Sequence, residues 1–199
     1  MVEESADPSN ELAERLRGLE TVFGPADDMH LHGVIPFFLG LDVGGTADAV
    51  TFSKFSASGK LHVSCELVGN PAQPANRDGQ YELAVCFGEA DVWALDLMLK
   101  LCHYTLETPL NHGETMDIGP AVPKGSPIAA LLFRKIGSYS AFGKPASVIC
   151  CVGITKRELK FARQRGTEAL MELMPSGFVL TTSERPEFVP RPRFPWLRA

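Results

Sequence analysis

Apolar residues recur along this chain with two different periods, and the changes between the periods predict a mixture of helices and strands. The first helix is predicted to begin at Asp7 and to end before the Gly24-Pro25 pair. Three leucines at helical spacing give this helix one apolar side (Leu12, Leu16, Leu19). The N-terminal stretch is therefore expected to pack as an amphipathic helix.

Short runs rich in β-branched and aromatic residues predict the strands. The predicted strands are residues 34–43, 49–55, 61–68, 81–87, 115–118, 128–133, 146–154 and 178–182. A Ser58-Gly59-Lys60 turn joins the second and third runs and predicts a hairpin. Residues 70–79 carry prolines and asparagines and are predicted to be a loop, as is the connection from 134 to 143.

A central helix is predicted to start after Asp91 and to end before Pro109. Its polar residues form one narrow stripe at i, i+4, i+7 and i+11 (Asp96, Lys100, His103, Glu107). The remaining positions are mostly apolar, so we expect protein to surround this helix on three sides. The stripe predicts two exposed i,i+4 pairs, Asp96 with Lys100 and His103 with Glu107.

The most ordered pattern runs from residue 142 to 174. A turn at Gly143, Lys144 and Pro145 precedes a buried strand, and Thr155 with Glu158 then has the spacing of a capping box. The helix that follows is predicted to carry one apolar stripe, interrupted by Gly166 (Leu159, Ala162, Ala169, Leu170, Leu173). A glycine there costs roughly 1 kcal/mol relative to alanine, so we expect a kink or break.

A length of 199 residues suits one domain, and the order of elements places it in the α+β class. We divide the chain into an acidic N-terminal helix (1–26), an α+β domain (27–183) and a Pro/Arg-rich tail (184–199). From Arg185 onward the tail holds four prolines and four arginines. Such a tail is expected to be extended or disordered unless it docks on the protein.

The net charge of −5 conceals a gradient along the chain. Residues 1–28 carry eight acids and two arginines, whereas residues 156–199 carry nine basic and five acidic side chains. An acidic chain is a poor nucleic-acid binder, because phosphate contacts need a basic face. No apolar run reaches the roughly 18 residues of a membrane span, and no signal sequence is recognisable, so we expect a cytoplasmic protein. Five cysteines without a C-x-x-C pair fit buried, reduced thiols.

Positive charge is concentrated in the first half of the last helix (Lys156, Arg157, Lys160, Arg163, Arg165). Cations at a helix N-terminus oppose the helix dipole, which costs a few tenths of a kcal/mol each. Two interpretations follow. The charges form either a solvated face or an electrostatic docking surface for an acidic protein partner, and for the second we name Arg157, Lys160 and Arg163.

The sequence L-D-V-G-G-T at positions 41–46 resembles the phosphate-binding hairpin of actin-like sugar kinases, with Asp42 near a metal and Thr46 at its end. Those enzymes carry the motif near the N-terminus and need a second lobe, so a structural Gly-Gly turn is the competing interpretation. His30 and His32 lie two residues apart and the other histidines are isolated, which is not metal-ligand spacing. No G-x-S-x-G motif occurs. We therefore assign no catalytic, cofactor or metal residue.

Four segments, in order, resemble the suppressor-of-fused domain in its short, single-domain bacterial form. They are G-Q-Y-E-L-A-V-C-F at 79–87, the helix of Trp93 ending H-Y-T-L at 106, H-G-E-T-M-D-I-G at 112–119, and A-F-G-K-P-A-S-V-I-C-C-V-G-I-T-K-R-E-L at 141–159. The resemblance spans roughly residues 27–182. The family's Arg and Gln in two of these segments are Cys86 and Cys150 here, so no functional residue is carried over.

The resemblance implies a mixed, mainly antiparallel β-sheet packed against helices, and a non-enzymatic protein that binds other proteins. Bacterial members are often proposed as immunity proteins that neutralise a toxin by binding it. The leading hypothesis is therefore a cytoplasmic, immunity-type protein-binding module without a cofactor. Two alternatives stay open. One is a small nucleotide- or sugar-phosphate-binding enzyme that uses the turn from Asp42 to Thr46, and the other is a structural domain that forms homo-oligomers.

Overall fold

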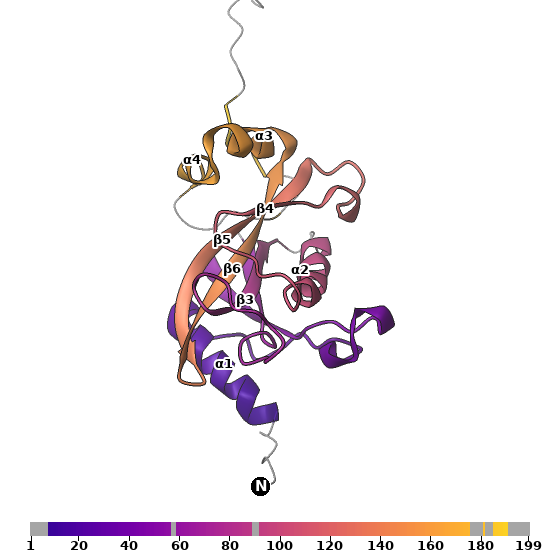
Figure 1. The fold of residues 1–199 in the computed structure, drawn as a ribbon, viewed down its shortest axis with the longest axis vertical. Helices are drawn as coiled ribbons and strands as arrows, with labels where there is room; N and C mark the ends of the chain where they lie inside the picture. The colour runs from indigo at the N-terminus through magenta and orange to yellow at the C-terminus, as the bar shows by residue number, and fades with distance from the viewer. Residues whose placement is uncertain (1–7, 57–58, 89–91, 176–180, 182–184, 191–199) are drawn as a thin grey trace, which may run out of the picture.

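A computed structural model describes residues 8–56, 59–88, 92–175, 181 and 185–190 (Figure 1). The described residues form a six-stranded sheet in the order β1-β2-β3-β6-β5-β4. β3 and β6 pair in parallel, and the other neighbours are antiparallel. The strands are β1 (Ala49–Ser56), β2 (Gly59–Ser64), β3 (Gln80–Phe87), β4 (Thr115–Asp117), β5 (Ile128–Ala141) and β6 (Lys144–Thr155). The predicted α+β class with a mixed, mainly antiparallel sheet is confirmed.

Helices cover both faces of the sheet (Figure 1). α1 (Pro8–Phe23), α3 (Lys156–Arg165) and α4 (Thr167–Leu173) lie on one face, and α2 (Trp93–Tyr104) lies on the other. Side chains alternate between these faces along β6, because successive Cβ atoms of a strand point to opposite sides. Cys150 accordingly packs with the α3 side and Cys151 with the α2 side.

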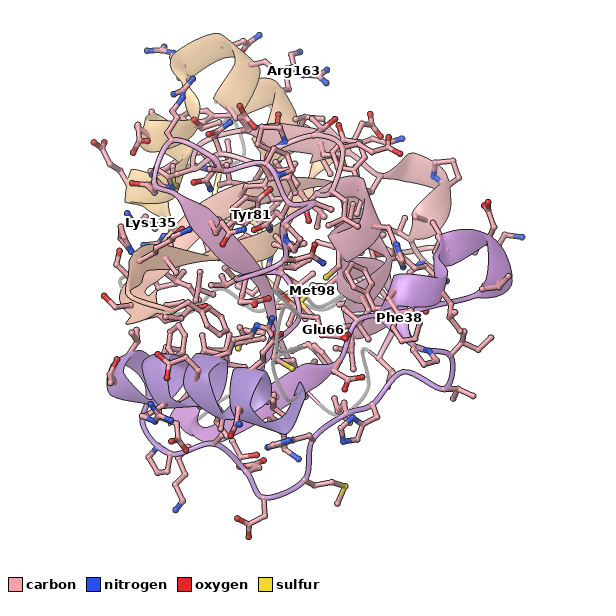
Figure 2. The ribbon with its side chains drawn as sticks, turned by 60° about the horizontal axis from the view of Figure 1, so that its bottom comes forward. Phe38, Glu66, Tyr81, Met98, Lys135 and Arg163 are labelled. Carbon is pink, nitrogen blue, oxygen red and sulfur yellow. The ribbon has the colours of Figure 1, made fainter. Side chains whose placement is uncertain are left out.

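The α2 side holds the largest single cluster of buried apolar side chains. Tyr81 of β3 and Met98 of α2 are both fully buried there, and Figure 2 shows them in the interior of the molecule. On the opposite side Leu19 and Phe23 of α1 pack on the sheet, which confirms the predicted amphipathic first helix and its end before Gly24. None of the helices in the described ranges is long and apolar enough to cross a membrane.

β5 and β6 form one long hairpin, and this corrects the predicted loop at 134–143. The ladder runs from Ile128 opposite Thr155 to Ala141 opposite Lys144, with register shifts between Ile128 and Ala130 and between Lys135 and Gly137. Only Phe142 and Gly143 make the turn, both at positive φ (53° and 69°), which suits a tight hairpin. Lys144 and Pro145 already belong to β6. The second half of β5 is polar enough to resemble a loop, but its backbone is fixed by pairing with β6.

The predicted strand at 34–43 is wrong. This segment forms two short 3-10 helices, Phe37–Leu39 and Leu41–Val43, on either side of Gly40 at φ 95°. Pro36 lacks the N–H that a strand interior needs. Apolar side chains here do not mark a buried strand, because Val34 and Phe38 remain 98% and 82% exposed.

β2 ends at Ser64, four residues before the predicted end, because a buried carboxylate captures the next backbone amides. Glu82 of β3 is 0% exposed and accepts hydrogen bonds from the N–H groups of Leu67 (3.1 Å) and Val68 (2.9 Å). Its other oxygen accepts from Ser64 Oγ at 2.5 Å. Burial raises the pKa of Glu82 to about 7, although these donors oppose the shift.

The polar stripe of α2 is only partly confirmed. Lys100 pairs with Asp96 at 2.7 Å on the exposed side, as predicted. The predicted pair of His103 with Glu107 is wrong, because the helix ends at Tyr104 and His103 turns to another segment. Its Nε2 lies 2.8 Å from the carbonyl oxygen of Gly45. Residue 91, predicted to start this helix, lies outside the described residues, as does all of the predicted strand 178–182 except Thr181.

α3 begins with the predicted capping box and ends at the predicted break. Gly166 has φ 91°, a left-handed value that separates α3 from α4. The apolar stripe is accordingly split between two helices. Leu159 and Leu170 are buried, whereas Leu173 is 41% exposed.

Candidate functional site

The cations singled out in the sequence lie on α3, whose first turn is held in place by reciprocal hydrogen bonds. Thr155 Oγ1 accepts from the N–H of Glu158 at 3.2 Å, and Glu158 Oε2 accepts from the N–H of Thr155 at 2.9 Å. The buried side of the helix carries Leu159 and Ala162. A firmly capped, packed helix presents its outer side chains from a fixed backbone.

Lys156, Lys160 and Arg163 are exposed on the outside of α3, and Figure 2 shows Arg163 at the rim of the molecule. These three cations line a groove of about 500 Å³ between α3 and the β4 end of the sheet. Leu159 and Ala129 supply apolar lining, and Asp117 is the one carboxylate in the lining. We call this feature the α3 groove. It is net positive and lies beside an edge strand.

Arg157 does not share the α3 groove with Lys160 and Arg163. It forms an ion pair with Glu187 and is about 30% exposed. It lines a neighbouring depression together with Thr155 and Arg185. The structure therefore brings two of the three predicted residues together and directs the third to a segment of the chain's own tail.

That segment, residues 185–190, runs across the N-terminus of α3, and we call it the strap. Arg185 Nη1 donates to Glu158 Oε1 at 3.0 Å, and Arg185 Nη2 donates to the carbonyl oxygen of Gly153 at 2.7 Å. The N–H of Phe188 also donates to Glu158 Oε1, at 2.8 Å. Val189 is buried against the α3 and α4 side chains. The tail is expected to be extended or disordered unless it docks on the protein, and residues 185–190 of it do dock, against α3 and the end of β6.

The pair of Arg185 and Glu158 is almost fully buried, with side chains 4% and 0% exposed. Burial alone would raise the pKa of Glu158, but the Arg185 guanidinium and the backbone donors of Phe188 and Thr155 outweigh it, so the pKa lies below its ordinary value. Sequence reasoning missed Arg185 because the Glu158 position was already explained by the capping box, and no local spacing links two residues 27 positions apart.

The glycine turn at positions 41–46 is closed by its own backbone. The N–H groups of Gly44, Gly45 and Thr46 donate to the carbonyl oxygens of Leu41 (2.8 Å), Gly40 (2.9 Å) and Ile35 (3.1 Å). A phosphate-binding turn needs such N–H groups directed at the ligand. These three are already engaged inside the segment.

No cluster of three or more His, Cys, Asp or Glu side chains with metal-binding geometry occurs among the residues that the structure describes. All five cysteines are buried and free. Burial raises the pKa of each thiol, which keeps it protonated and unreactive (Cys65, Cys86, Cys102, Cys150, Cys151). The positively charged α3 groove thus remains the site that fits the sequence prediction best, and its charge complements an acidic ligand.

Comparison with known proteins adds a family and a fold. A family model described as "Suppressor of fused protein (SUFU)" matches residues 54–185, from β1 to Arg185. No protein in the curated collection matches the sequence. Among solved structures, a chain of the Sufu–Fu complex crystal structure superposes with a TM-score of 0.70 at 10% identity, over 89% of this chain and 92% of that chain.

A SUFU homolog from Neisseria gonorrhoeae gives a TM-score of 0.66 at 14% identity, over 92% of this chain and 99% of that chain. Drosophila Suppressor of Fused gives 0.53 at 11% identity, over 65% of this chain but only 39% of that chain. At such identities these likenesses show the fold alone, while the family model covers well over half of the sequence.

Proposed function

The chain belongs to the suppressor of fused protein family, and on that premise we propose that it is a non-enzymatic protein-binding module whose acidic partner docks in the α3 groove. The family resemblance supports a binding role, because one structure with this fold is solved as the Sufu–Fu complex. The charge and shape of the groove indicate the kind of partner that this chain takes.

One observation carries the proposal: α3 presents three exposed cations to the α3 groove from a backbone that is fixed at its start. Lys156, Lys160 and Arg163 have no carboxylate partner within the described part of the chain, whereas Arg157 and Arg185 are both paired. Unpaired charges on a rigid element favour electrostatic steering of a partner with a complementary face. Apolar contacts from Leu159 and Ala129 then add affinity once water is excluded.

We place the partner among toxins or other effectors and the module among immunity-type proteins of the cytoplasm. Such a protein works by occupying a surface of its target, which requires a stable scaffold and no catalytic group. A buried, protonated set of thiols and a closed glycine turn are consistent with that role. The enzyme alternative has no further observation in its favour.

The test is co-purification of the tagged protein with its partner from the native host, followed by affinity measurement on the isolated pair. Lys160→Glu combined with Arg163→Glu is expected to lower the affinity at least about tenfold, mainly through the association rate, and to weaken its salt dependence. Lys54→Glu is the matched control, because Lys54 is an exposed lysine on β1, at the other edge of the sheet.

An affinity unchanged in the double variant would remove the α3 groove from the interface. Arg157→Ala separates direct contact from support. If Arg157 serves mainly to hold Glu187, this change lowers the stability of the strap but leaves the salt dependence of binding as it was. Thermal stabilisation by Mg-ATP that disappears in Asp42→Ala would instead favour the enzyme alternative.

A further inference from the structure

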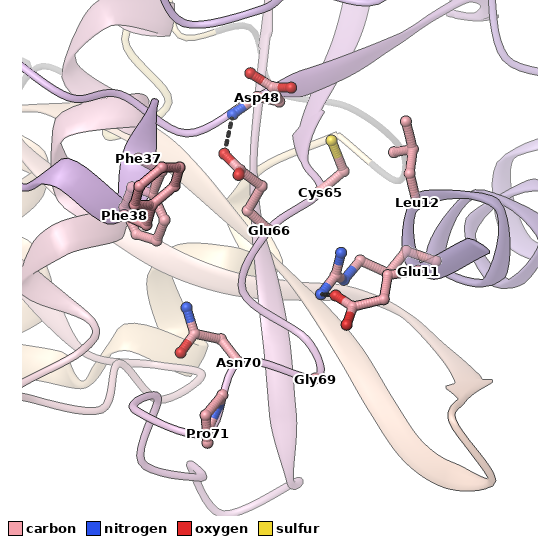
Figure 3. Close-up of a pocket in the computed structure, with 11 residues that line it drawn as sticks. Glu11, Leu12, Phe37, Phe38, Asp48, Cys65, Glu66, Gly69, Asn70 and Pro71 are labelled. Carbon is pink, nitrogen blue, oxygen red and sulfur yellow. Dashed lines mark hydrogen bonds and ion pairs between the residues drawn. The ribbon is translucent and has the colours of Figure 1, made fainter. Parts of the chain in front are cut away.

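A second candidate interface lies at the end of the molecule opposite the α3 groove. A cavity of about 500 Å³ opens between α1, the 3-10 helix Phe37–Leu39 and the loop that follows β2 (Figure 3). Its walls combine carboxylates with aromatic and aliphatic side chains (Glu11, Leu12, Phe37, Phe38, Asp48, Glu66). We call it the acidic pocket.

The acidic pocket has an excess of negative charge that its own cation does not neutralise. Arg15 is the one basic side chain in the lining and is itself 7% exposed. Its Nε donates to the carbonyl oxygen of Val68 at 2.5 Å, and its Nη2 donates to Glu11 at 3.0 Å. Arg15 is therefore committed to α1 and the loop. Both oxygens of Asp48 are engaged as well, by His32 and by the N–H of Gly33, which leaves Glu66 as the carboxylate available to a cation.

Glu66 and Asp48 are held in position by neighbours. The N–H of Asp48 donates to Glu66 Oε2 at 2.7 Å, as Figure 3 shows. His32 Nδ1 lies 2.6 Å from one oxygen of Asp48, at the outer side of the pocket. Burial raises the pKa of Glu66, so a cation in the pocket would relieve an unfavourable buried charge.

The aromatic wall continues into a ledge of exposed apolar side chains. Phe38 is 82% exposed, and four more large apolar side chains of the same segment are each at least 47% exposed (Val34, Leu39, Leu41, Val43). Exposed apolar side chains grouped in one segment mark an interaction surface more often than a solvated one. Aromatic faces beside carboxylates are suited to a guanidinium flanked by apolar residues.

We propose that the acidic pocket and its apolar ledge bind residues 191–199 of a second copy of this chain. That segment reads R-P-R-F-P-W-L-R-A. It carries three arginines, a phenylalanine, a tryptophan and no acid, which complements both the charge and the apolar character of the pocket. An arginine enters between Phe38 and Glu66, and Phe194 or Trp196 covers the ledge.

The occupant is the tail of a second copy, because the chain's own tail is too short to reach the acidic pocket. The strap lies where Thr155 pairs with Ile128, at one end of β5. The pocket lies at the other end, where Arg15 stacks 5.3 Å over the ring of Phe142. At about 3.3 Å per residue the 14 residues of β5 separate the two ends by roughly 40 Å. The nine residues 191–199 extend about 30 Å at most, which is still short of the pocket.

Mutual exchange of tails would close a two-fold dimer, since each copy offers one tail and one pocket. Direct contact of pocket with pocket is disfavoured, because like charges would face each other. This inference does not depend on the α3 groove or on the identity of any other partner, so either proposal can fail without the other.

The first test is the mass of the intact protein across a dilution series, by sedimentation or light scattering. We expect a concentration-dependent dimer that becomes monomeric when residues 191–199 are deleted. The dimer should also weaken about fivefold to tenfold in Phe38→Ala and in Glu66→Gln, and at high salt. Leu173→Ala is the matched control, because Leu173 is an exposed leucine on α4, 41% uncovered.

The second test adds a fluorescein-labelled peptide of residues 190–199 to the protein lacking 191–199. Saturable binding that Phe38→Ala and Glu66→Gln weaken and Leu173→Ala leaves unchanged supports the proposal. A monomer at all concentrations together with no peptide binding overturns it. So does peptide binding that neither pocket variant affects, because the tail would then dock elsewhere.

Discussion

Replacing Arg185 with methionine removes the guanidinium that neutralises Glu158 beneath the strap. Glu158 is 0% exposed, so its carboxylate would stay buried with only backbone donors. Breaking a buried ion pair on one side costs about 3–5 kcal/mol. Because Phe188 and Thr155 still donate their N–H groups, we expect the lower end, about 3 kcal/mol. For a chain of this size that corresponds to a fall in Tm of roughly 6–12 °C.

The pH dependence of this loss of stability is more diagnostic than its size at a single pH. In the wild type the pKa of Glu158 is below its ordinary value. The stability that ionised Glu158 contributes is therefore present above the pKa of the unfolded state, and it is lost as the pH falls through the pKa of the folded state. In Arg185→Met burial acts without the guanidinium, and the pKa of Glu158 rises. The variant's deficit relative to wild type should therefore shrink as the carboxyl becomes protonated.

The assay is urea unfolding followed by far-UV circular dichroism, at about pH 7 and about pH 5. Glu158→Gln is a useful second variant, since glutamine can keep the capping box while removing the charge. Arg185→Met in that background should cost less than in the wild type. Arg163→Met, at an exposed arginine of α3, is the control. A loss below about 1 kcal/mol for Arg185→Met, typical of a surface pair, would refute the reasoning.

Three further predictions concern other parts of the scaffold. The folded pKa of Glu82, about 7, is above the unfolded value, so the free energy of unfolding falls as the pH rises from about 4.5 to about 7. Denaturant unfolding of Glu82→Gln across this pH range should show a weaker dependence of stability on pH. A pH dependence equal to that of the wild type would contradict the prediction. Glu82→Ala should cost about 2–3 kcal/mol by denaturant unfolding, because the N–H groups of Leu67 and Val68 lose their acceptor. Gly166→Ala should cost about 1 kcal/mol by thermal unfolding, although nothing crowds its Cβ position, because φ is 91°; no change would mean that the α3–α4 junction adapts.

The positive charge of the proposed docking surface was predictable from the sequence. Lys160 and Arg163 could be singled out because they lie within one helix whose capping box is recognisable in the sequence. Arg157 looked equivalent to them on the same helix, yet Glu187, 30 residues later, pairs with it. The acidic pocket was not predictable, because it joins α1 to two loops whose geometry depends on Arg15 and Glu82.

Several local features of this protein follow from neighbouring residues alone. The capping box at Thr155, the break at Gly166, the end of α1 before Gly24 and the alternation of Cys150 and Cys151 across β6 all arise from residues within a few positions of each other. Each depends on the identity and spacing of neighbouring residues, so a short pattern is enough to reveal it.

Tertiary structure decided the features whose partners are far apart along the chain. β5 continues through its polar half because β6 supplies the hydrogen bonds. His103 contacts the carbonyl oxygen of Gly45, 58 residues away, rather than Glu107. Within residues 34–43 Phe37 is buried, whereas Val34 and Phe38 stay exposed, since hydrophobicity alone does not say which side chains the fold will cover. Only the folded chain shows which buried groups, such as Glu158 and Arg185, meet and neutralise one another.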